Sequence, residues 1–172
     1  ASIAHFYFES IHPFEDGNGR IGRGLVKKII SQHMGYPTLI SLSNVICDQR
    51  KTYYSQLEAY NKTLKLDGWI DYFSHVILEA QESTIHLINF IIRKGKILST
   101  PTLNPRQIKV LTRMFKEGLK GFKGGVSAEN YIAISKTSPA TATRDLQDLV
   151  RKKILYRTGV FKATRYFFEN IS

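Results

Sequence analysis

The sequence predicts a mostly α-helical protein in two parts, a helical bundle at residues 1–98 and a smaller domain of three helices and a β-hairpin at residues 105–172. Three observations predict this fold class. Apolar residues recur at helical spacing through almost all of the first part. Pro101, Pro105 and small polar residues interrupt that pattern at residues 99–105, and we interpret residues 99–104 as a linker. β-Rich runs then follow near the C-terminus. A chain of 172 residues that is 42% hydrophobic is large enough for two small packed domains.

The periodicity of the first part predicts four helices, at residues 3–11, 20–34, 49–64 and 69–93. The segment Gly35-Tyr36-Pro37 ends the second helix, because glycine favours a helix C-terminus and proline cannot continue one. Residues 65–68 separate the last two helices.

The second part begins with a predicted helix that starts after Asn104, followed by a glycine-rich break at residues 118–125 and a short helix from Ser127. Ser138 followed by Pro139 is a strong N-cap and first-turn pair, so another helix starts there. Its inward positions are Ala142, Leu146, Leu149 and Val150. The β-rich runs 154–158 and 162–168, joined at Gly159, predict a hairpin.

The basic charge is concentrated in the second part. The chain has 25 Lys and Arg against 14 Asp and Glu, a net charge of +11, and residues 99–172 alone have 14 against 5, a net charge of +9. Such an asymmetry indicates a polyanionic partner, although solubility alone can also account for it. Cys47 is the only cysteine, which excludes an internal disulfide and a thiolate zinc site. A single cysteine fits a reducing compartment, so we expect a cytoplasmic protein. The apolar stretches are too short to span a membrane, so we expect no membrane partner.

The segment 12–20, His-Pro-Phe-Glu-Asp-Gly-Asn-Gly-Arg, is a polar, glycine-rich loop between two predicted helices. A loop that leads into a helix N-terminus directs unpaired backbone N–H groups and the positive end of the helix dipole at its surroundings. Gly17, Asn18 and Gly19 would let phosphate oxygens approach this backbone closely. The loop is therefore a candidate anion site.

Charged side chains extend this candidate site. Arg20, Arg23 and Lys27 fall at i, i+3 and i+7 and share one helix face, and a guanidinium can bind phosphate oxygens bidentately. Asp16 offers a hard oxygen ligand suited to Mg²⁺. His12 is a candidate general base, because histidine is the side-chain type that ordinarily changes charge near neutral pH.

Other interpretations of the same residues are weaker. Residues 17–22 match G-x-G-x-x-G, but the preceding segment is helical and no acidic residue follows about 20 positions later, which argues against a dinucleotide fold. The chain has no G-K-[ST], which excludes a P-loop. Asp-Gly and Asn-Gly also occur in ordinary turns, and a lone histidine such as His12 is more often structural than catalytic.

The stretch HPFEDGNGRIGR resembles the signature of Fic (Fido) domains, H-x-F-x-[DE]-G-N-x-R-x-x-R, at all seven specified positions. The resemblance implies a protein AMP-transferase that moves AMP from ATP to a Ser, Thr or Tyr hydroxyl of a target protein. It gives His12 the role of the base, Asp16 that of the Mg²⁺ ligand, and Phe14 that of an anchor in the core. Gly17, Asn18 and Gly19 correspond to the anion hole, and Arg20 and Arg23 to the pair that reaches the distal phosphates. We take His12, Asn18, Arg20 and Arg23 as the catalytic set.

Two further features bear on this resemblance. Tyr54 and Asn61, seven residues apart in a predicted helix, correspond to residues that line the adenine pocket of the family. Gly19 favours AMP transfer, because relatives with Lys in that place resemble the Doc type, which phosphorylates. The resemblance covers about residues 1–95 and lacks the helices and target-docking hairpin that precede the signature in the family. We therefore expect the C-terminal portion of a longer Fic protein, bacterial in style, with weak or no activity as a fragment.

Three helices and a hairpin resemble a winged helix-turn-helix, which implies binding of duplex DNA or docking of a protein. The expected nucleic-acid contacts are Lys136, Thr141, Thr143, Arg144, Arg157, Lys162 and Arg165. The expected partners are thus a target protein with a hydroxyl side chain, duplex DNA and, as one option for assembly, a second copy in a homodimer. Two alternatives stay open, a DNA-binding transcriptional regulator whose Fic-like half senses nucleotide, and a scaffold that does neither.

Overall fold

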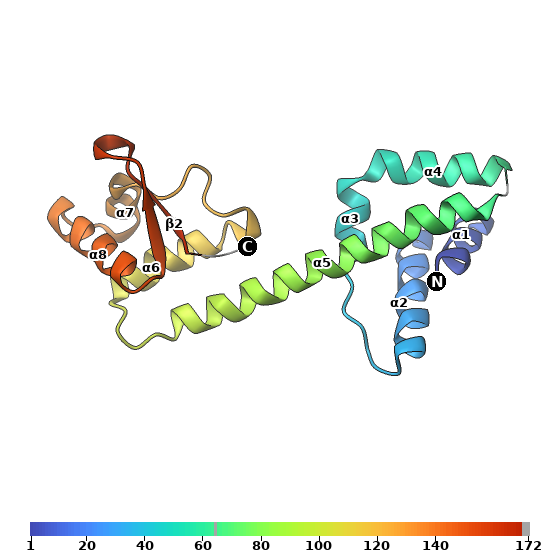
Figure 1. The fold of residues 1–172 in the computed structure, drawn as a ribbon, viewed down its shortest axis with the longest axis horizontal. Helices are drawn as coiled ribbons and strands as arrows, with labels where there is room; N and C mark the ends of the chain where they lie inside the picture. The colour runs from blue at the N-terminus through green and yellow to red at the C-terminus, as the bar shows by residue number, and fades with distance from the viewer. Residues whose placement is uncertain (64, 170–172) are drawn as a thin grey trace. The chain divides into compact units, whose positions relative to one another are not determined.

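The computed structural model describes residues 1–63 and 65–169, and eight α-helices form most of that part of the chain (Figure 1). The predicted mostly helical fold is confirmed. The chain divides into two compact units, residues 1–85 and 86–172. Within the described residues, no helix combines the length and the apolar character that crossing a bilayer requires.

Five helices begin in the first unit. They are α1 (Ser2–Ile11), α2 (Asn18–Met34), α3 (Leu42–Asp48), α4 (Arg50–Thr63) and α5 (Leu66–Leu98), of which α5 continues into the second unit. The sequence did not predict α3, a helix of seven residues that buries Leu42, Val45 and Ile46. The predicted end of the fourth helix, Leu64, lies outside the described residues.

The core of the first unit is an aromatic cluster that joins α1 to α5. Trp69 and Phe73 stack with ring centroids 5.2 Å apart, and the buried imidazole of His5 stacks on Phe73 at 4.5 Å. The indole N–H of Trp69 donates to the carbonyl of Ser2 at 2.9 Å. Because α1 ends at Ile11, this core anchors the chain immediately before the predicted anion loop.

The helices on the two sides of the loop pack closely at Gly22. A β-carbon at this buried position would collide with the Glu9 carboxylate and lie 3.1 Å from Nδ1 of His5. Only glycine therefore allows α2 to approach α1 this closely without displacing one of these side chains. The loop between them is consequently held at both ends.

The second unit contains α6 (Pro105–Phe115), α7 (Ala128–Ser135), α8 (Pro139–Arg151) and an antiparallel hairpin of β1 (Leu155–Thr158) and β2 (Arg165–Phe168). Short 3₁₀ turns lie at Gly118–Lys120 and Phe161–Ala163. Residues 99–104 connect α5 to α6. Val126 pairs with Tyr166 in an isolated bridge, so β2 is bonded on both sides. The three helices and the hairpin predicted from the sequence are present.

The capping residues in the sequence correctly predicted where α6 and α8 begin. Asn104 caps α6, because its side chain accepts from the Gln107 N–H at 2.9 Å, and α8 has Ser138 as N-cap and Pro139 in its first turn. Three of the four predicted inward residues of α8, Ala142, Leu146 and Leu149, are buried, and Val150 is half-buried.

The hairpin departs from prediction in one place. Residues 162–164 were expected to begin the second strand, but they belong to the 3₁₀ turn and its C-cap, and β2 starts at Arg165. The reason is local, because Phe161 has a positive φ of 50° and its carbonyl accepts from the Thr164 N–H at 3.1 Å. This turn presents Phe161 to solvent.

A buried carboxylate holds the helices of the second unit together. Asp145 of α8 accepts hydrogen bonds of 2.9 Å from the Arg106 guanidinium, the Tyr131 hydroxyl and the Asn104 amide. Burial raises the pKa of Asp145, but these three donors outweigh burial and hold it below its usual value. The charge therefore ties α8 to α6 and α7.

Candidate functional site

The loop at residues 12–17 connects α1 to α2 and is closed by Asn18. The buried amide of Asn18 accepts from the Phe14 N–H at 3.0 Å and donates to the Phe14 carbonyl at 2.5 Å. Positive φ angles at His12 (50°) and Gly17 (86°) turn the chain at the two ends of the loop. These features give the loop a compact, cup-like path.

The cup lies at the N-terminus of α2. The hydrogen bond from the Ile21 N–H to the Gly17 carbonyl, at 3.0 Å, opens the helix, so the amides of residues 18–20 precede its hydrogen-bonding pattern. These amides lie at the positive end of a helix of 17 residues. The arrangement is suited to hold an anion.

Asp16 and Arg20 pair at the mouth of this cup. Oδ2 of Asp16 accepts from Nη2 of Arg20 at 3.0 Å, and its Oδ1 accepts from the Gly17 N–H at 2.6 Å. Both side chains are largely exposed, with 74% of Arg20 and 92% of Asp16 accessible. Because exposed ion pairs contribute little free energy, an incoming phosphate can compete for Arg20.

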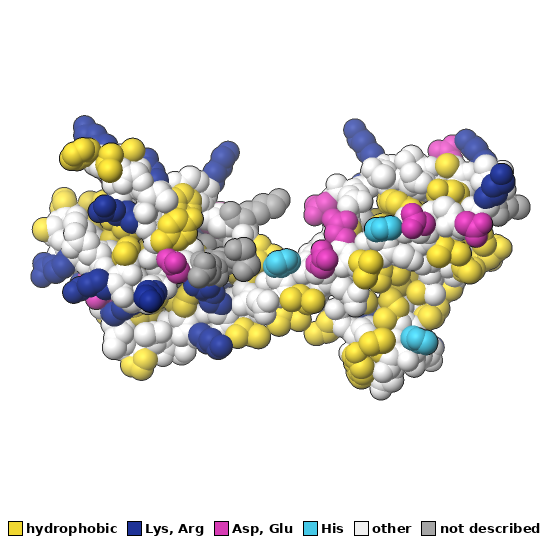
Figure 2. Space-filling view, viewed as in Figure 1, with side chains coloured by type: hydrophobic (Ala, Val, Ile, Leu, Met, Phe, Trp, Pro, Cys, Tyr) yellow, Lys and Arg dark blue, Asp and Glu magenta, His cyan; other side chains and the backbone are white. Residues whose placement is uncertain are grey.

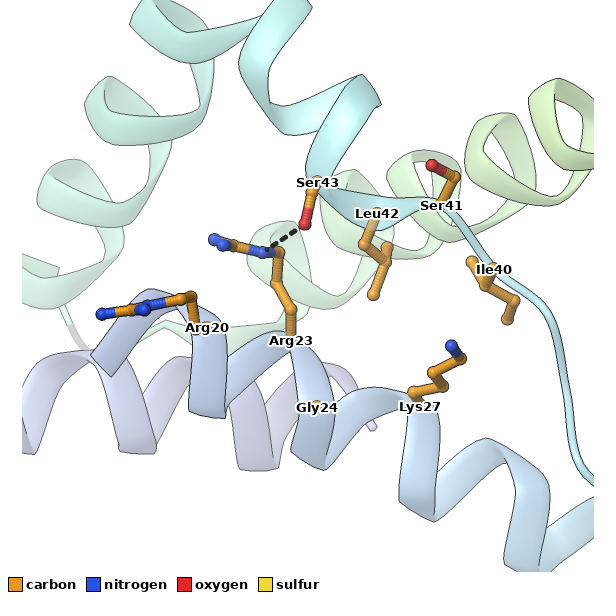
Figure 3. Close-up of a pocket in the computed structure, with 8 residues that line it drawn as sticks. All are labelled: Arg20, Arg23, Gly24, Lys27, Ile40, Ser41, Leu42 and Ser43. Atoms are coloured by element: carbon orange, nitrogen blue, oxygen red, sulfur yellow. Dashed lines mark hydrogen bonds between the residues drawn. The ribbon is translucent and has the colours of Figure 1, made fainter. Parts of the chain in front are cut away.

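Arg23 lies one helical turn further along α2 and is held from two sides. Its Nε–H donates to Oγ of Ser43, the second residue of α3, at 2.9 Å. Its Nη1 lies 3.0 Å from the position that a β-carbon on Gly19 would occupy. Arg20, Arg23 and Lys27 line a cavity of about 290 Å³ whose other wall is the segment 40–43 (Figure 3).

His12 caps the C-terminus of α1 and is exposed, with its backbone N–H bonded to the Phe8 carbonyl at 3.1 Å. The carboxylate of Glu9 interacts electrostatically with both His12 and Arg23. Burial raises the pKa of Glu9, and the charges of Arg23 and His12 oppose that rise. The base and the second arginine of the predicted set therefore lie within electrostatic range of one half-buried side chain.

Phe14 does not anchor the loop as expected. The residue is 49% exposed, and its ring contacts that of Phe8 with centroids 6.3 Å apart. The anchoring contact is made instead by its backbone, through the two hydrogen bonds with Asn18.

The residues predicted for the adenine pocket lie on α4. Tyr54 and Asn61 are both exposed, and the Arg50 guanidinium lies over the Tyr54 ring at 5.8 Å. Their neighbour Tyr53 is buried instead, and its hydroxyl bonds Nε2 of His5 at 2.9 Å.

The described residues contain no cluster of three or more His, Cys, Asp or Glu side chains that could hold a metal ion by themselves. Asp16 supplies a single exposed carboxylate at the mouth of the cup. This donor set still fits Mg²⁺, because that ion is commonly held by one or two carboxylates together with substrate phosphates and water.

The predicted nucleic-acid residues lie on α8, the hairpin and their neighbours. Lys136 follows α7, Arg144 is exposed in α8, and Arg157 and Lys162 are exposed on the hairpin. A cavity of about 270 Å³ is lined by three of these residues, Thr143, Arg157 and Lys162. Its other lining residues include Glu129 and Phe161.

Internal hydrogen bonds occupy the rest of this set. Arg165 donates to the carbonyls of Lys162 and Thr164 at 3.0 and 2.8 Å. The hydroxyl of Thr141 accepts from Ser138 at 3.0 Å, and that of Thr143 donates to the Pro139 carbonyl at 3.0 Å.

Sequence reasoning missed two residues that the structure brings to notice, Ser43 beside Arg23 and Phe161 at the hairpin tip, which is 95% exposed. Ser43 is 20 residues from Arg23, and no local pattern joins them. Phe161 had a signal, because it is a large apolar residue directly after a glycine turn.

Residues 1–30 match the family model of the Fic/DOC family. The chain is 32% identical over 139 residues to the protein adenylyltransferase Fic of Drosophila grimshawi, a match that covers 81% of this chain and 24% of that relative. For the proteins of the same name from Drosophila virilis and Drosophila melanogaster, the identity is 33% over 118 residues and 36% over 87 residues. These matches cover 69% and 51% of this chain and 20% and 16% of the relatives.

The chain thus spans about a quarter or less of the length of the curated relatives it matches. The matched segment 1–30 contains the whole loop and its two arginines. Together with the loop's geometry, these similarities support a Fic-domain protein.

Proposed function

We propose that this chain carries the phosphate-handling part of a protein adenylyltransferase, which transfers AMP from ATP to a Ser, Thr or Tyr hydroxyl of a target protein. The observation that carries this proposal is the cup closed by Asn18 at the N-terminus of α2, with Arg20 and Arg23 on the adjoining helix face. The name of the relatives, protein adenylyltransferase, adds support.

In the proposed reaction, His12 accepts the proton of the target hydroxyl as its oxygen attacks the α-phosphorus of ATP. A new O–P bond to the target forms while the bond between the α-phosphorus and the bridging oxygen breaks, and pyrophosphate leaves with that oxygen. The protein contributes positioning and charge neutralisation, since phosphoryl-type transfer needs little covalent help.

The other residues act on the phosphates. The amides of residues 18–20 stabilise negative charge as it redistributes, and the guanidiniums of Arg20 and Arg23 hold the departing phosphates. Asp16 would hold Mg²⁺, which when bound neutralises phosphate charge. Tyr54 and Asn61 are proposed for the adenine, where an exposed aromatic ring offers a stacking surface.

The test is to incubate the longer Fic protein of which we expect this chain to be a portion with Mg²⁺-ATP and a cell lysate, and to search by mass spectrometry for an AMP-sized addition on that protein or on another one. We expect the adduct with the wild-type protein and its loss with His12→Ala. The matched control is His33→Ala, which removes another exposed histidine from the far end of α2. An undiminished adduct in His12→Ala would show that another group is the base.

A second candidate function is binding of duplex DNA by a winged-helix-like second unit. It is supported by the net charge of +9 in residues 99–172 and by Lys and Arg side chains, which outnumber Asp and Glu over α6–α8 and the hairpin in Figure 2. Arg144, Arg157 and Lys162 are exposed there. In this proposal Thr141, Thr143 and Arg144 of α8 approach base edges. The phosphates are contacted along the helix flank and the hairpin by Lys136, Arg157, Lys162 and Arg165.

Titration of a fluorescent DNA duplex at rising salt tests this second proposal. We expect affinity to fall steeply between about 50 and 200 mM salt, and Lys162→Ala to lower the salt slope by about one. Lys28→Ala, in the first unit, is the control. Absence of binding at low salt would remove the proposal. DNA binding together with ATP binding but no AMP transfer would instead favour a nucleotide-sensing regulator.

A further inference from the structure

The cavity next to the cup has a one-sided charge distribution. Three cations of α2, Arg20, Arg23 and Lys27, lie along one wall, and the residues that line the cavity include no Asp or Glu. Ile40 and Leu42 form part of the opposite wall and are themselves buried in the core of the first unit. The cavity therefore has a fixed apolar wall facing a cationic one.

Lys27 is the member of this set that the proposed reaction does not use. It lies four residues after Arg23, which places it about 6 Å further along the same helix face. Figure 3 shows its side chain directed from α2 toward the space beside Ile40 and Leu42. Its exposed ammonium group can therefore reach an anion that extends past Arg23.

Ser43 fixes the direction of the Arg23 guanidinium. Because the hydrogen bond to Oγ uses Nε, the terminal nitrogens of the guanidinium are directed away from Ser43, as Figure 3 shows. The same guanidinium lies against Gly19, whose amide belongs to the cup. Because this guanidinium is already held in place, it loses less side-chain conformational entropy on binding a phosphate than an unrestrained arginine would.

We propose that Lys27 is a further direct ligand of the distal phosphates beyond Arg20 and Arg23, and that Ser43 is a positioning residue that acts through Arg23. The inference rests on the proposed AMP transfer and extends it to two residues that lie outside the HPFEDGNGRIGR motif. The ligand group is a diphosphate, which could arrive as part of ATP or as free pyrophosphate.

Calorimetric titration of the 172-residue chain with ATP, AMP and pyrophosphate separates these sources. With Lys27→Ala we expect about a fivefold loss of affinity for ATP and for pyrophosphate and unchanged affinity for AMP, which lacks the distal phosphates. Lys28→Ala, the neighbouring exposed lysine on a different face of α2, is the matched control and should bind all three as the wild type does. A loss for ATP with none for pyrophosphate would limit this role of Lys27 to the bound nucleotide.

Ser43→Ala should weaken ATP and pyrophosphate binding while leaving AMP binding and thermal unfolding unchanged, and Ser43→Thr should restore the affinity because it keeps the hydroxyl. A double-mutant cycle with Arg23→Ala tests whether Ser43 acts on phosphate binding through Arg23. If Ser43 acts through Arg23, Ser43→Ala has no further effect once Arg23 is removed. Additive losses would overturn the positioning role.

The result also distinguishes the two proposals. A wild-type chain that binds neither ATP nor pyrophosphate would overturn the proposed function and this inference together. A wild-type protein that transfers AMP, but in which Lys27→Ala and Ser43→Ala bind both ATP and pyrophosphate as tightly as Lys28→Ala does, would overturn the inference alone.

Discussion

Acid should destabilise the first unit through His5. Burial among Trp69 and Phe73 lowers the pKa of His5 from 6.5 to about 4. The folded state therefore keeps the imidazole neutral, whereas the unfolded chain takes up a proton as pH falls below 6.5. Because the unfolded state then binds more protons, the free energy of unfolding falls as pH drops from 6.5 toward 4.

The size of this effect follows from the shift. At about 1.4 kcal/mol per pKa unit, a shift from 6.5 to about 4 corresponds to a loss of about 3 kcal/mol across the window. Glu9 opposes part of this loss of unfolding free energy. Burial raises the pKa of its carboxyl, so the folded state takes up a proton more readily than the unfolded state and is stabilised as pH falls. The expected net loss is therefore somewhat smaller.

Trp69 makes the assay specific to this unit, because it is the only tryptophan of the chain and is packed beside His5. Urea unfolding followed by its fluorescence should give a free energy that declines between pH 7 and pH 4. His5→Gln, which does not titrate and can still bond the Tyr53 hydroxyl, should flatten the decline, and Glu9→Gln should steepen it. An equal decline in His5→Gln and wild type would refute the reasoning.

Three further predictions concern packing and the loop. Gly22→Ala should destabilise the first unit by about 1 to 2 kcal/mol in urea unfolding, because its methyl group overpacks the contact with Glu9 and His5; unchanged stability would mean that α1 and α2 can move apart. Asn18→Ala removes both bonds that close the cup and should weaken pyrophosphate binding at least about tenfold by calorimetry. Wild-type affinity would show that the cup needs no such closure. Asp145→Ala should cost the second unit about 3 kcal/mol in thermal unfolding followed by circular dichroism, since it leaves donors of α6 and α7 without their acceptor. A stable variant would contradict the role given to that charge.

Local chemistry explains what the sequence predicted well. Ser138-Pro139 and Asn104-Pro105 specify helix starts through adjacent atoms, so both α8 and α6 begin where expected. The loop at residues 12–17 was likewise recognisable, because its glycines and polar residues are contiguous. Seven residues are too few for a periodic pattern, which is why α3 was missed.

Contacts between distant residues explain what it could not predict. The partners of Asp145 on α6 are about 40 residues away along the chain, so the sequence gives no reason to expect a buried carboxylate in α8. Ser43 contacts Arg23 only because the fold brings α3 next to α2, and no local sequence pattern predicts that contact. Phe14 was expected in the core, but its backbone, not its ring, makes the anchoring contacts.

The amide that closes the cup also exposes the protein to slow chemical damage. Asn18 precedes Gly19, and asparagine followed by glycine is the sequence in which the side-chain amide loses its nitrogen most readily. Conversion to a carboxylate would remove the only donor group of that side chain and leave the carbonyl of Phe14 without it. It would also place a negative charge at the N-terminus of α2, where the proposed phosphate binds. Burial of Asn18 and its two hydrogen bonds to Phe14 hold this amide in the folded protein, so we expect the damage to proceed mainly when the first unit unfolds.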